Sequence, residues 1–129
     1  MSNLIKIKKK INSFNKTISV SGDKSLSIRW ILFSSLAKGK SKAFNLLLSD
    51  DVLATIKAVR KLGIKVKLNK NYCTVFGNGP NGFKYKKDII IDSENSGTLG
   101  RLIMGVLIDT PYKIKIIGDK SLSKRDFNR

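Results

Sequence analysis

Apolar and polar residues alternate along the chain in a way that predicts short strands separated by amphipathic helices. The pattern indicates helices at 25–37, 50–62 and 97–108. It indicates strands at 4–8, 17–20, 43–48, 64–68, 72–76, 88–91 and 113–117. The order is strand, helix, strand, helix, strand, strand, after which the cycle begins again. This order predicts an α/β fold (α+β in some classifications) whose helices cover one face of each sheet.

Each of the first two predicted helices has an apolar face. We expect the helix at 25–37 to bury Leu26, Trp30, Ile31, Phe33 and Leu36. The next helix has Ser49 as N-cap, acidic residues in its first turn and Gly63 as its end. Its expected buried residues are Val52, Ile56, Val59 and Leu62.

Composition narrows the possible chemistry. The 129 residues suffice for one domain, and no apolar stretch approaches the roughly 18 residues of a membrane span. The chain has no histidine and few carboxylates, which excludes histidine-based catalysis and disfavours a metal site. The single cysteine, Cys73, lies in a predicted strand, so we expect a small core residue and a reducing, cytoplasmic setting.

The net charge of +17 suggests an anionic partner, although it also fits a chain that has simply accumulated lysine. Only five of the 26 basic residues are arginines, which favours a specific role for those that remain. A nucleic-acid surface would interleave aromatic with basic residues. We expect the aromatics to lie in the core, which favours a small anion over nucleic acid: Trp30, Phe33, Phe44 and Phe76.

An eight-residue motif occurs twice, at 22–29 and at 118–125, with seven identical positions. In the first copy Lys24, Ser25 and Arg29 stand at the start of a predicted helix, where free N–H groups also attract anions. N-capping by Ser25 beside solvated basic residues explains this copy equally well. The segment 95–101 precedes another helix and is either an anion cradle or a simple capped start. Lys124 and Arg125 by themselves are typical of a solvated patch.

Taken together, these motifs resemble those of the EPSP synthase (3-phosphoshikimate 1-carboxyvinyltransferase) family. The matching segments are Gly-Asp-Lys-Ser-Leu-Ser-Ile-Arg at 22–29, Asn-Ser-Gly-Thr from 95 and Gly-Asp-Lys-Ser-Leu-Ser-Lys-Arg at 118–125. The resemblance implies the inside-out barrel of enolpyruvyl transferases, in which repeated βαβαββ units form two globules. It implies that 1–129 is a single incomplete domain: a first unit at 16–92, the start of the next at 93–129, and a strand near 4–8 that belongs to a missing second globule.

The resemblance also implies transfer of the enolpyruvyl group from phosphoenolpyruvate to the 5-hydroxyl of 3-phosphoshikimate, with release of phosphate. Lys24 would contact both substrates and act in catalysis, and Ser25 and Arg29 would hold 3-phosphoshikimate. Lys24 would share the binding of phosphoenolpyruvate with Asn95, Gly97 and Arg125. The family implies no metal and no organic cofactor, no nucleic-acid or membrane partner, a cytoplasmic location and a monomer.

Two departures from the family pattern affect these expectations. Asp126 follows Arg125 where the family usually has proline, and its carboxylate would compete for the guanidinium. The chain is also much shorter than the family, whose remaining catalytic carboxylates lie beyond this segment, so we expect 1–129 alone to be inactive. The alternatives are a small basic nucleic-acid-binding module and an anion-binding domain without catalysis.

Overall fold

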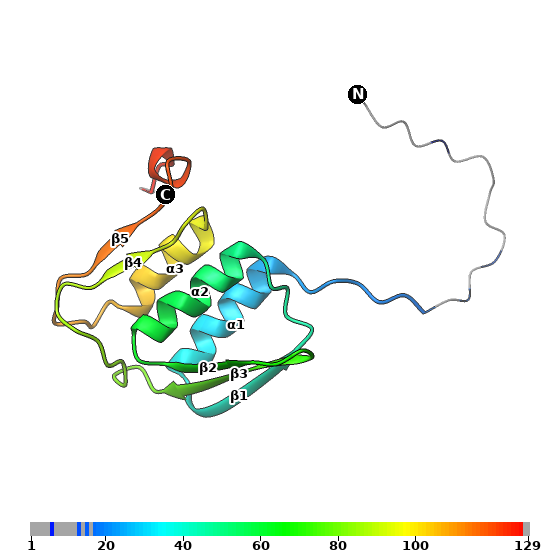
Figure 1. Ribbon diagram of the computed structural model, residues 1–129, viewed down its shortest axis with the longest axis horizontal. Helices are drawn as coiled ribbons and strands as arrows, with labels where there is room; N and C mark the ends of the chain where they lie inside the picture. Colours follow the sequence, from blue (N-terminus) through cyan, green and yellow to red (C-terminus); the bar gives the residue numbers. More distant parts are fainter. Residues whose placement is uncertain (1–5, 7–12, 14, 16, 128–129) are drawn as a thin grey trace.

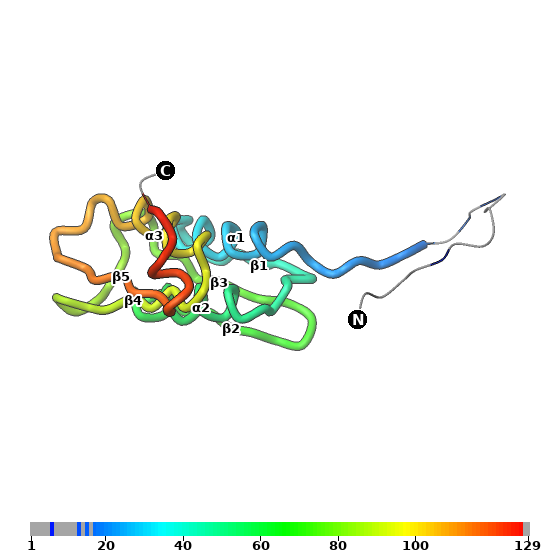
Figure 2. Tube along the Cα trace, turned by 90° about the horizontal axis from the view of Figure 1, so that it is seen from above, coloured from blue at the N-terminus to red at the C-terminus, as the bar shows by residue number. Residues whose placement is uncertain are grey.

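The computed structural model describes residues 6, 13, 15 and 17–127. The strand predicted at 4–8 lies outside the described residues, apart from Lys6. The prediction of a strand at 17–20 is wrong, because this segment pairs with no strand of the described chain and its Ile18 and Val20 are about 70% exposed. Figure 2 shows it leading away from the helices, tied near its end by a hydrogen bond of 3.2 Å from Asn45 Nδ2 to the Val20 carbonyl.

Helices and strands alternate through the rest of the described chain (Figure 1). In order, the elements are α1 (Lys24–Leu36), β1 (Lys38–Phe44), α2 (Asp50–Lys61), β2 (Lys65–Leu68), β3 (Tyr72–Asn78), β4 (Ile90–Asp92), α3 (Gly97–Val106), β5 (Lys115–Ile117) and a single 3₁₀ turn, η1 (Leu122–Lys124).

The strands form two sheets. The antiparallel sheet has the order β1-β3-β2, with Phe44 opposite Tyr72 and Lys65 opposite Phe76, and the strands predicted at 64–68 and 72–76 form its hairpin of β2 and β3. β4 and β5 pair in parallel, and α3 connects them. Figure 1 shows α1 and α2 on one face of the antiparallel sheet, so the prediction that helices cover one sheet face holds here.

The first strand of this sheet begins five residues earlier than predicted. β1 occupies 38–44, whereas the apolar run suggested 43–48. Lys38, Lys40 and Lys42 all point to the solvent face, so the strand lacks the apolar residues on which the prediction relied. Pairing with β3 along its whole length defines the strand, and residues 46–48 lead into α2.

The buried face of α1 differs from the predicted one. Ile31 is buried as expected, but Leu26 and Phe33 are 64% and 65% exposed. Serines take part of the buried face (Ser27, Ser34 and Ser35). The Ser35 hydroxyl donates to the Ile31 carbonyl at 2.7 Å, which satisfies its hydrogen-bonding need inside the core.

α2 agrees closely with the prediction. It follows the N-cap Ser49, and Gly63 after it has a φ of +84°, a conformation that favours glycine. The four predicted face residues are fully buried: Val52, Ile56, Val59 and Leu62. This helix is amphipathic, has acidic residues in its first turn and ends at a glycine, so its local sequence predicts it well, although the Ser49 hydroxyl makes no capping hydrogen bond.

All three helices contribute to one continuous core, which includes Ile28, Ile56, Val75, Ile91 and Leu99. Cys73 is buried there, and burial raises the pKa of its thiol, which confirms a small core residue.

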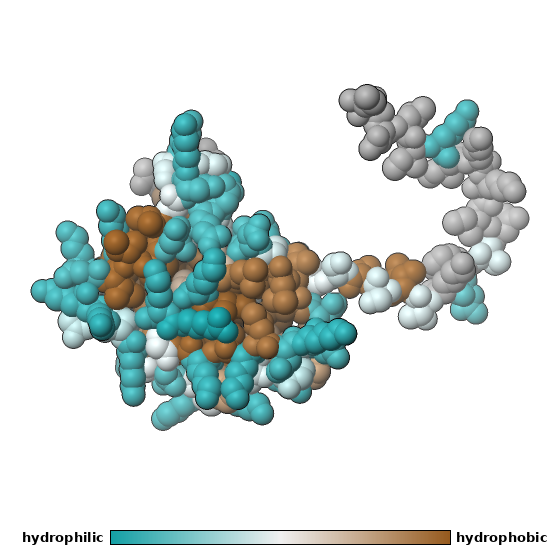
Figure 3. All heavy atoms as spheres, in the orientation of Figure 1, coloured by the Kyte–Doolittle hydropathy of each residue, from teal (hydrophilic) through white to brown (hydrophobic). Residues whose placement is uncertain are grey.

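The prediction of aromatic core residues is partly wrong. Phe33 and Phe44 are each 65% exposed, and Trp30 and Phe76 are only partly buried. Figure 3 shows further apolar surface, including a patch over β4 and β5, where Ile90 and Ile117 are exposed. Among the helices of the described residues, none has the length and apolar character needed to cross a bilayer.

Candidate active site

Lys24 and Ser25 lie in the first turn of α1, and Asn95 and Gly97 lie at the start of α3. Figure 1 shows α1, α2 and α3 running the same way, so their N-terminal ends lie toward the same side of the molecule. The N-caps are Asp23, Ser49 and Ser96. Each N-terminus has the positive end of the helix dipole, and the backbone N–H groups that Asp23 and Ser96 do not cap favour an anion on this side of the molecule.

The first copy of the repeated motif forms the start of α1. Asp23 is the N-cap, and its carboxylate accepts a hydrogen bond from the Leu26 N–H at 2.7 Å. Capping by Ser25, one of the explanations left open by the sequence, is therefore wrong. Ser27 donates to the Asp23 carbonyl at 2.6 Å and accepts from the Leu47 N–H at 3.1 Å, which fixes the corner against the segment before α2.

Lys24 reaches across to the neighbouring helix. Its ammonium group lies 2.9 Å from the Asp51 carboxylate, in the first turn of α2, and the Lys24 side chain is about half exposed. Arg29 is exposed and borders a cavity of about 250 Å³ between α1 and α3. Ser25 is partly buried in the first turn of α1.

The second copy of the motif forms a corner together with the start of α3. Arg125 Nη2 donates to Asn95 Oδ1 at 2.8 Å, and Asn95 Nδ2 donates to Asp119 Oδ2 at 2.6 Å. Gly97 lies beside them: a Cβ atom added at this position would be 3.2 Å from Arg125 Nη1. The structure thus brings together three of the residues predicted to bind phosphoenolpyruvate: Asn95, Gly97 and Arg125.

The two copies of the motif start their helical turns in the same way. Asp119 accepts from the Leu122 N–H at 2.6 Å, as Asp23 accepts from Leu26 in the first copy. The Ser123 N–H donates to the Asp119 carbonyl at 2.9 Å, as the Ser27 N–H donates to Asp23 at 3.0 Å. The repeat in the sequence therefore encodes a repeated local structure, an aspartate-capped helical turn.

Hydrogen bonds hold Asp119 in its charged form. The bond from Asn95 lowers the pKa of its carboxyl group most, followed by the bond from the Leu122 N–H and the charge of Arg125. Asp119 therefore remains ionised and holds Asn95, which in turn positions Arg125.

The segment after Arg125 packs against α3. Arg101 Nη2 donates to the Asp126 carbonyl at 2.8 Å, and its guanidinium lies 5.3 Å from the centre of the Phe127 ring. A direct effect of the Asp126 carboxylate on Arg125 stays a prediction. What the structure adds is that the backbone of residue 126 is held by α3.

The structure groups the predicted residues at two corners: Lys24 and Ser25 at the first, and Asn95, Gly97 and Arg125 at the second. An ion pair of 2.8 Å between Lys57 and Glu94 connects α2 to the second corner, where the Glu94 carbonyl also accepts from the Asp119 N–H at 2.7 Å. A single cleft lined by both corners and by Arg29 stays a prediction.

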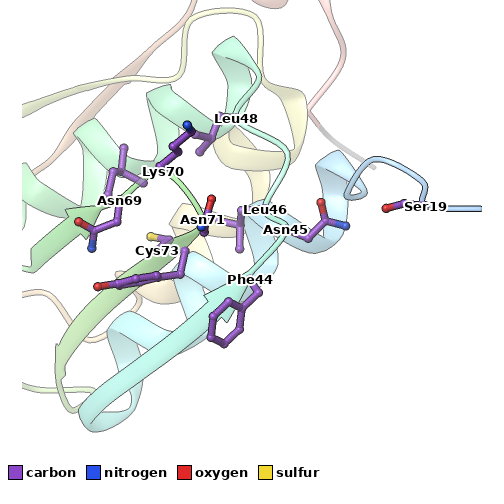
Figure 4. A pocket seen from close by; sticks show the side chains of 11 residues that line it. Ser19, Phe44, Asn45, Leu46, Leu48, Asn69, Lys70, Asn71 and Cys73 are labelled. Carbon is purple, nitrogen blue, oxygen red and sulfur yellow. The ribbon is translucent and has the colours of Figure 1, made fainter.

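A separate pocket of about 520 Å³ lies between the segment after β1 and the turn between β2 and β3 (Figure 4). Its lining includes Asn45, Asn69, Lys70 and Asn71, and none of the predicted site residues. The described residues also contain no cluster of three or more histidine, cysteine or acidic side chains that could hold a metal ion.

Sequence reasoning missed two residues that organise the corners, Asp51 and Asp119. Asp51 was interpreted only as a first-turn residue of α2, yet it pairs with Lys24. Asp119 occupies the same place in its motif as Asp23 in the first copy. That repetition of an aspartate before a helical turn is the signal that identifies Asp23 and Asp119 as caps.

Comparisons with known proteins agree on one family. The family model described as EPSP synthase (3-phosphoshikimate 1-carboxyvinyltransferase) matches residues 8–129. The 3-phosphoshikimate 1-carboxyvinyltransferase of Bacillus cytotoxicus is 43% identical over 115 residues, which are 89% of this chain and 27% of that protein. The enzyme of the same name from Streptococcus mutans is 40% identical over 125 residues, 97% of this chain and 29% of that protein.

A solved structure shows the same fold. The EPSP synthase of Acinetobacter baumannii superposes with a TM-score of 0.77 at 37% identity, over 84% of this chain and 24% of that one. The chain thus spans about a quarter of the length of the relatives that it matches. Over this length its architecture is that of the α/β enolpyruvyl transferase fold, as the sequence predicts.

Proposed function

The chain belongs to the EPSP synthase family, and we propose that it forms part of the site where an enolpyruvyl group is transferred from phosphoenolpyruvate to 3-phosphoshikimate. Since the chain spans about a quarter of its relatives, the proposal concerns the contribution of these residues to the whole enzyme. One observation carries it: Arg125 is fixed by Asn95 beside Gly97, at the start of α3.

The reaction joins two phosphorylated carboxylic acids. The 5-hydroxyl group of 3-phosphoshikimate loses its proton and its oxygen bonds to C2 of phosphoenolpyruvate while C3 gains a proton, which gives a tetrahedral intermediate. C3 then loses a proton, the bond from C2 to the phosphate oxygen breaks, and inorganic phosphate leaves. Because both substrates are polyanions, the protein must offset their repulsion before they can react.

We assign phosphoenolpyruvate to the second corner. Arg125 would hold its phosphate in a two-point contact, which suits a guanidinium better than an ammonium group. Gly97 has no side chain, so the backbone N–H groups at the start of α3 can approach the ligand. Asn95, held by Asp119, would keep the guanidinium in position.

We assign 3-phosphoshikimate to the first corner. Ser25 and Arg29 lie four residues apart on α1 and so on neighbouring turns of one face, where they would hold the carboxylate. Lys24 would contact both substrates and help to move the proton. Its present partner, Asp51, keeps the ammonium group at this end of the helices until a substrate phosphate or carboxylate replaces it.

The remaining parts of the proposal concern setting and partners. We place the protein in the cytoplasm as a monomer that acts on these two small anions without a metal or organic cofactor. Its single cysteine, Cys73, is free and buried, which fits a reducing compartment.

A titration followed by NMR tests the binding assignment directly. We expect phosphoenolpyruvate to shift the amide signals of Asn95 and Gly97 in 1–129, and 3-phosphoshikimate to shift those of Ser25 and Arg29. The variant Arg125→Gln should weaken the phosphoenolpyruvate response about tenfold or more, since a charge-assisted hydrogen bond contributes roughly 1.5–3 kcal/mol. Lys124→Gln, which removes the same charge from the neighbouring residue, should leave it nearly unchanged.

Equal losses in the two variants would contradict a specific role for Arg125 and indicate attraction by net charge alone. Phosphate release should be measured on the same samples. Turnover by 1–129 would overturn our expectation that this chain is inactive by itself.

A further inference from the structure

The outer face of the antiparallel sheet is strongly basic. The inner face packs on the helices through Val66, Cys73 and Val75, all buried. Strand pairing places the alternate residues on the opposite face. These outer-face residues are Lys38, Lys40, Lys42 and Phe44 on β1, Lys65 and Lys67 on β2, and Tyr72, Thr74, Phe76 and Asn78 on β3.

The lysines of this face are interleaved with aromatic rings. Lys42 Nζ lies 3.8 Å from the centre of the Tyr72 ring and 4.9 Å from that of Phe44. Lys65 and Lys67 lie 5.5 and 6.0 Å from the centre of the Phe76 ring. Phe44 is nevertheless 65% exposed, so its ring remains available to a partner.

No carboxylate offsets this charge within the sheet. The three strands contain no aspartate or glutamate, so the outer face has five lysines and no acid. The ion pairs among the described residues involve Lys24 and Lys57, which lie on α1 and α2. Figure 1 shows that this face points away from the helices, so its charge is separate from the proposed active site.

We propose that this outer face, defined by the residues named above, binds single-stranded nucleic acid without sequence preference. Lysines attract phosphates of any sequence, and exposed aromatic rings stack on unpaired bases. A sheet face that combines both is a known way to hold single strands. Phe44, which the sequence pattern predicts to be in the core, is exposed beside lysines, as in a surface that binds nucleic acid.

Fluorescence anisotropy with a labelled oligothymidylate of about 20 nucleotides tests the proposal, with 1–129 at two salt concentrations. The variant Lys40→Gln/Lys42→Gln/Lys67→Gln should lose about tenfold or more in affinity. Its log–log salt slope should fall by about 2, since each phosphate contact of a single strand contributes roughly 0.7. A matched control, Lys86→Gln/Lys87→Gln/Lys113→Gln, removes the same charge from exposed loop positions and should change affinity less than about twofold.

A second variant tests stacking separately from charge. Phe44→Ala should weaken oligothymidylate binding by roughly fivefold to a hundredfold, the range measured for loss of one stacked base. An oligouridylate of the same length should bind like the DNA, because phosphates and bases are common to both. A DNA duplex should bind more weakly, because its bases are already stacked.

Three results would overturn the proposal: no binding by 1–129, equal losses in the two triple variants, or duplex binding as tight as that of the single strand. Circular dichroism confirms that each variant is folded, so a loss of binding is not a loss of structure. The substituted residues are exposed, and we expect all of these variants to fold.

Discussion

Arg125 donates a hydrogen bond of 2.8 Å to the side-chain oxygen of Asn95, 30 residues earlier in the chain. The parallel pairing of β4 and β5 explains how they meet. The carboxyl ends of parallel strands lie at the same edge, so the segments after Asp92 and after Ile117 become neighbours. Asn95 therefore links the start of α3 to the second copy of the repeated motif.

Replacement of Asn95 should release both of its partners. In Asn95→Ala we expect the pKa of Asp119 to rise toward its ordinary value, because the bond from Asn95 is the largest cause of its lowering. The phosphoenolpyruvate affinity of 1–129 should fall as well, since Arg125 loses its support. An NMR pH titration of the Asp119 carboxyl carbon measures the first effect. Asn81→Ala, at an exposed loop position, is the control, and an unshifted Asp119 in Asn95→Ala would contradict the prediction.

The stability of the second corner should depend on pH in the acid range. Folding lowers the pKa of Asp119, so its contribution is complete above the unfolded pKa, about 4, and is lost as the pH falls through the lowered folded value. We therefore expect Asp119→Asn to be less stable than the original chain at pH 7, with a smaller difference near pH 3. Urea unfolding at both values measures it.

The control for this pH dependence is Asp109→Asn, which changes an exposed carboxylate in the turn after α3. A stability difference in Asp119→Asn that is the same at both pH values would show that the charge of Asp119 does not matter. The aspartate would then act only as a hydrogen-bonding cap.

Local sequence predicted some elements well and others poorly, for identifiable reasons. The prediction of α2 was correct because its apolar spacing, acidic first turn and terminal Gly63 all indicate the same helix. The predicted bounds of β1 were wrong because its outward side chains are lysines, and only pairing with β3 defines the strand. The predicted buried face of α1 was wrong because serines share it. The hydroxyls of Ser27 and Ser35 donate to backbone carbonyls four residues earlier, so these side chains can be buried.

The candidate site was predictable residue by residue but not as an assembly. The motifs identified Lys24, Asn95, Gly97 and Arg125, yet each has an ordinary structural explanation by itself. What unites the second corner is the crossover from β4 through α3 to β5, a contact between distant segments. The periodicity of apolar residues along the chain does not show which corners lie next to each other in the fold.

The position of Gly97 leads to a prediction with an internal control. The methyl group of Gly97→Ala would lie 3.2 Å from Arg125 Nη1 and 3.7 Å from Leu122, so the guanidinium has to move. We expect weaker phosphoenolpyruvate binding with a stability change below about 1 kcal/mol. Gly105→Ala, in the same helix, meets no atom within 4 Å and should stabilise the protein by about 0.5–1 kcal/mol without affecting binding. Unchanged binding in Gly97→Ala would contradict the proposed approach of the ligand.

The corrected face of α1 can be tested by a pair of substitutions. Ile28 is fully buried, whereas Leu26, two residues earlier, is 64% exposed. Ile28→Ala should lower the free energy of unfolding by about 2–5 kcal/mol, because it leaves a cavity in the core. Leu26→Ala should change it by less than about 0.5 kcal/mol. Chemical denaturation measures both, and the opposite ranking would show that the sequence-based face is the correct one.

Substitutions of Lys24 and of its ion-pair partner Asp51 distinguish a structural role of Lys24 from a role in binding. The pair is partly exposed, so solvent screening limits its contribution to stability to about 1 kcal/mol or less. If Lys24 serves mainly to hold α1 against α2, then Lys24→Gln and Asp51→Asn should have similar effects on every property. If it binds the substrates, Lys24→Gln should weaken the response of 1–129 to both anions, whereas Asp51→Asn should strengthen it by freeing the ammonium group. We expect the second pattern in parallel NMR titrations of the two variants, and matching losses of affinity in both would assign Lys24 to the fold alone.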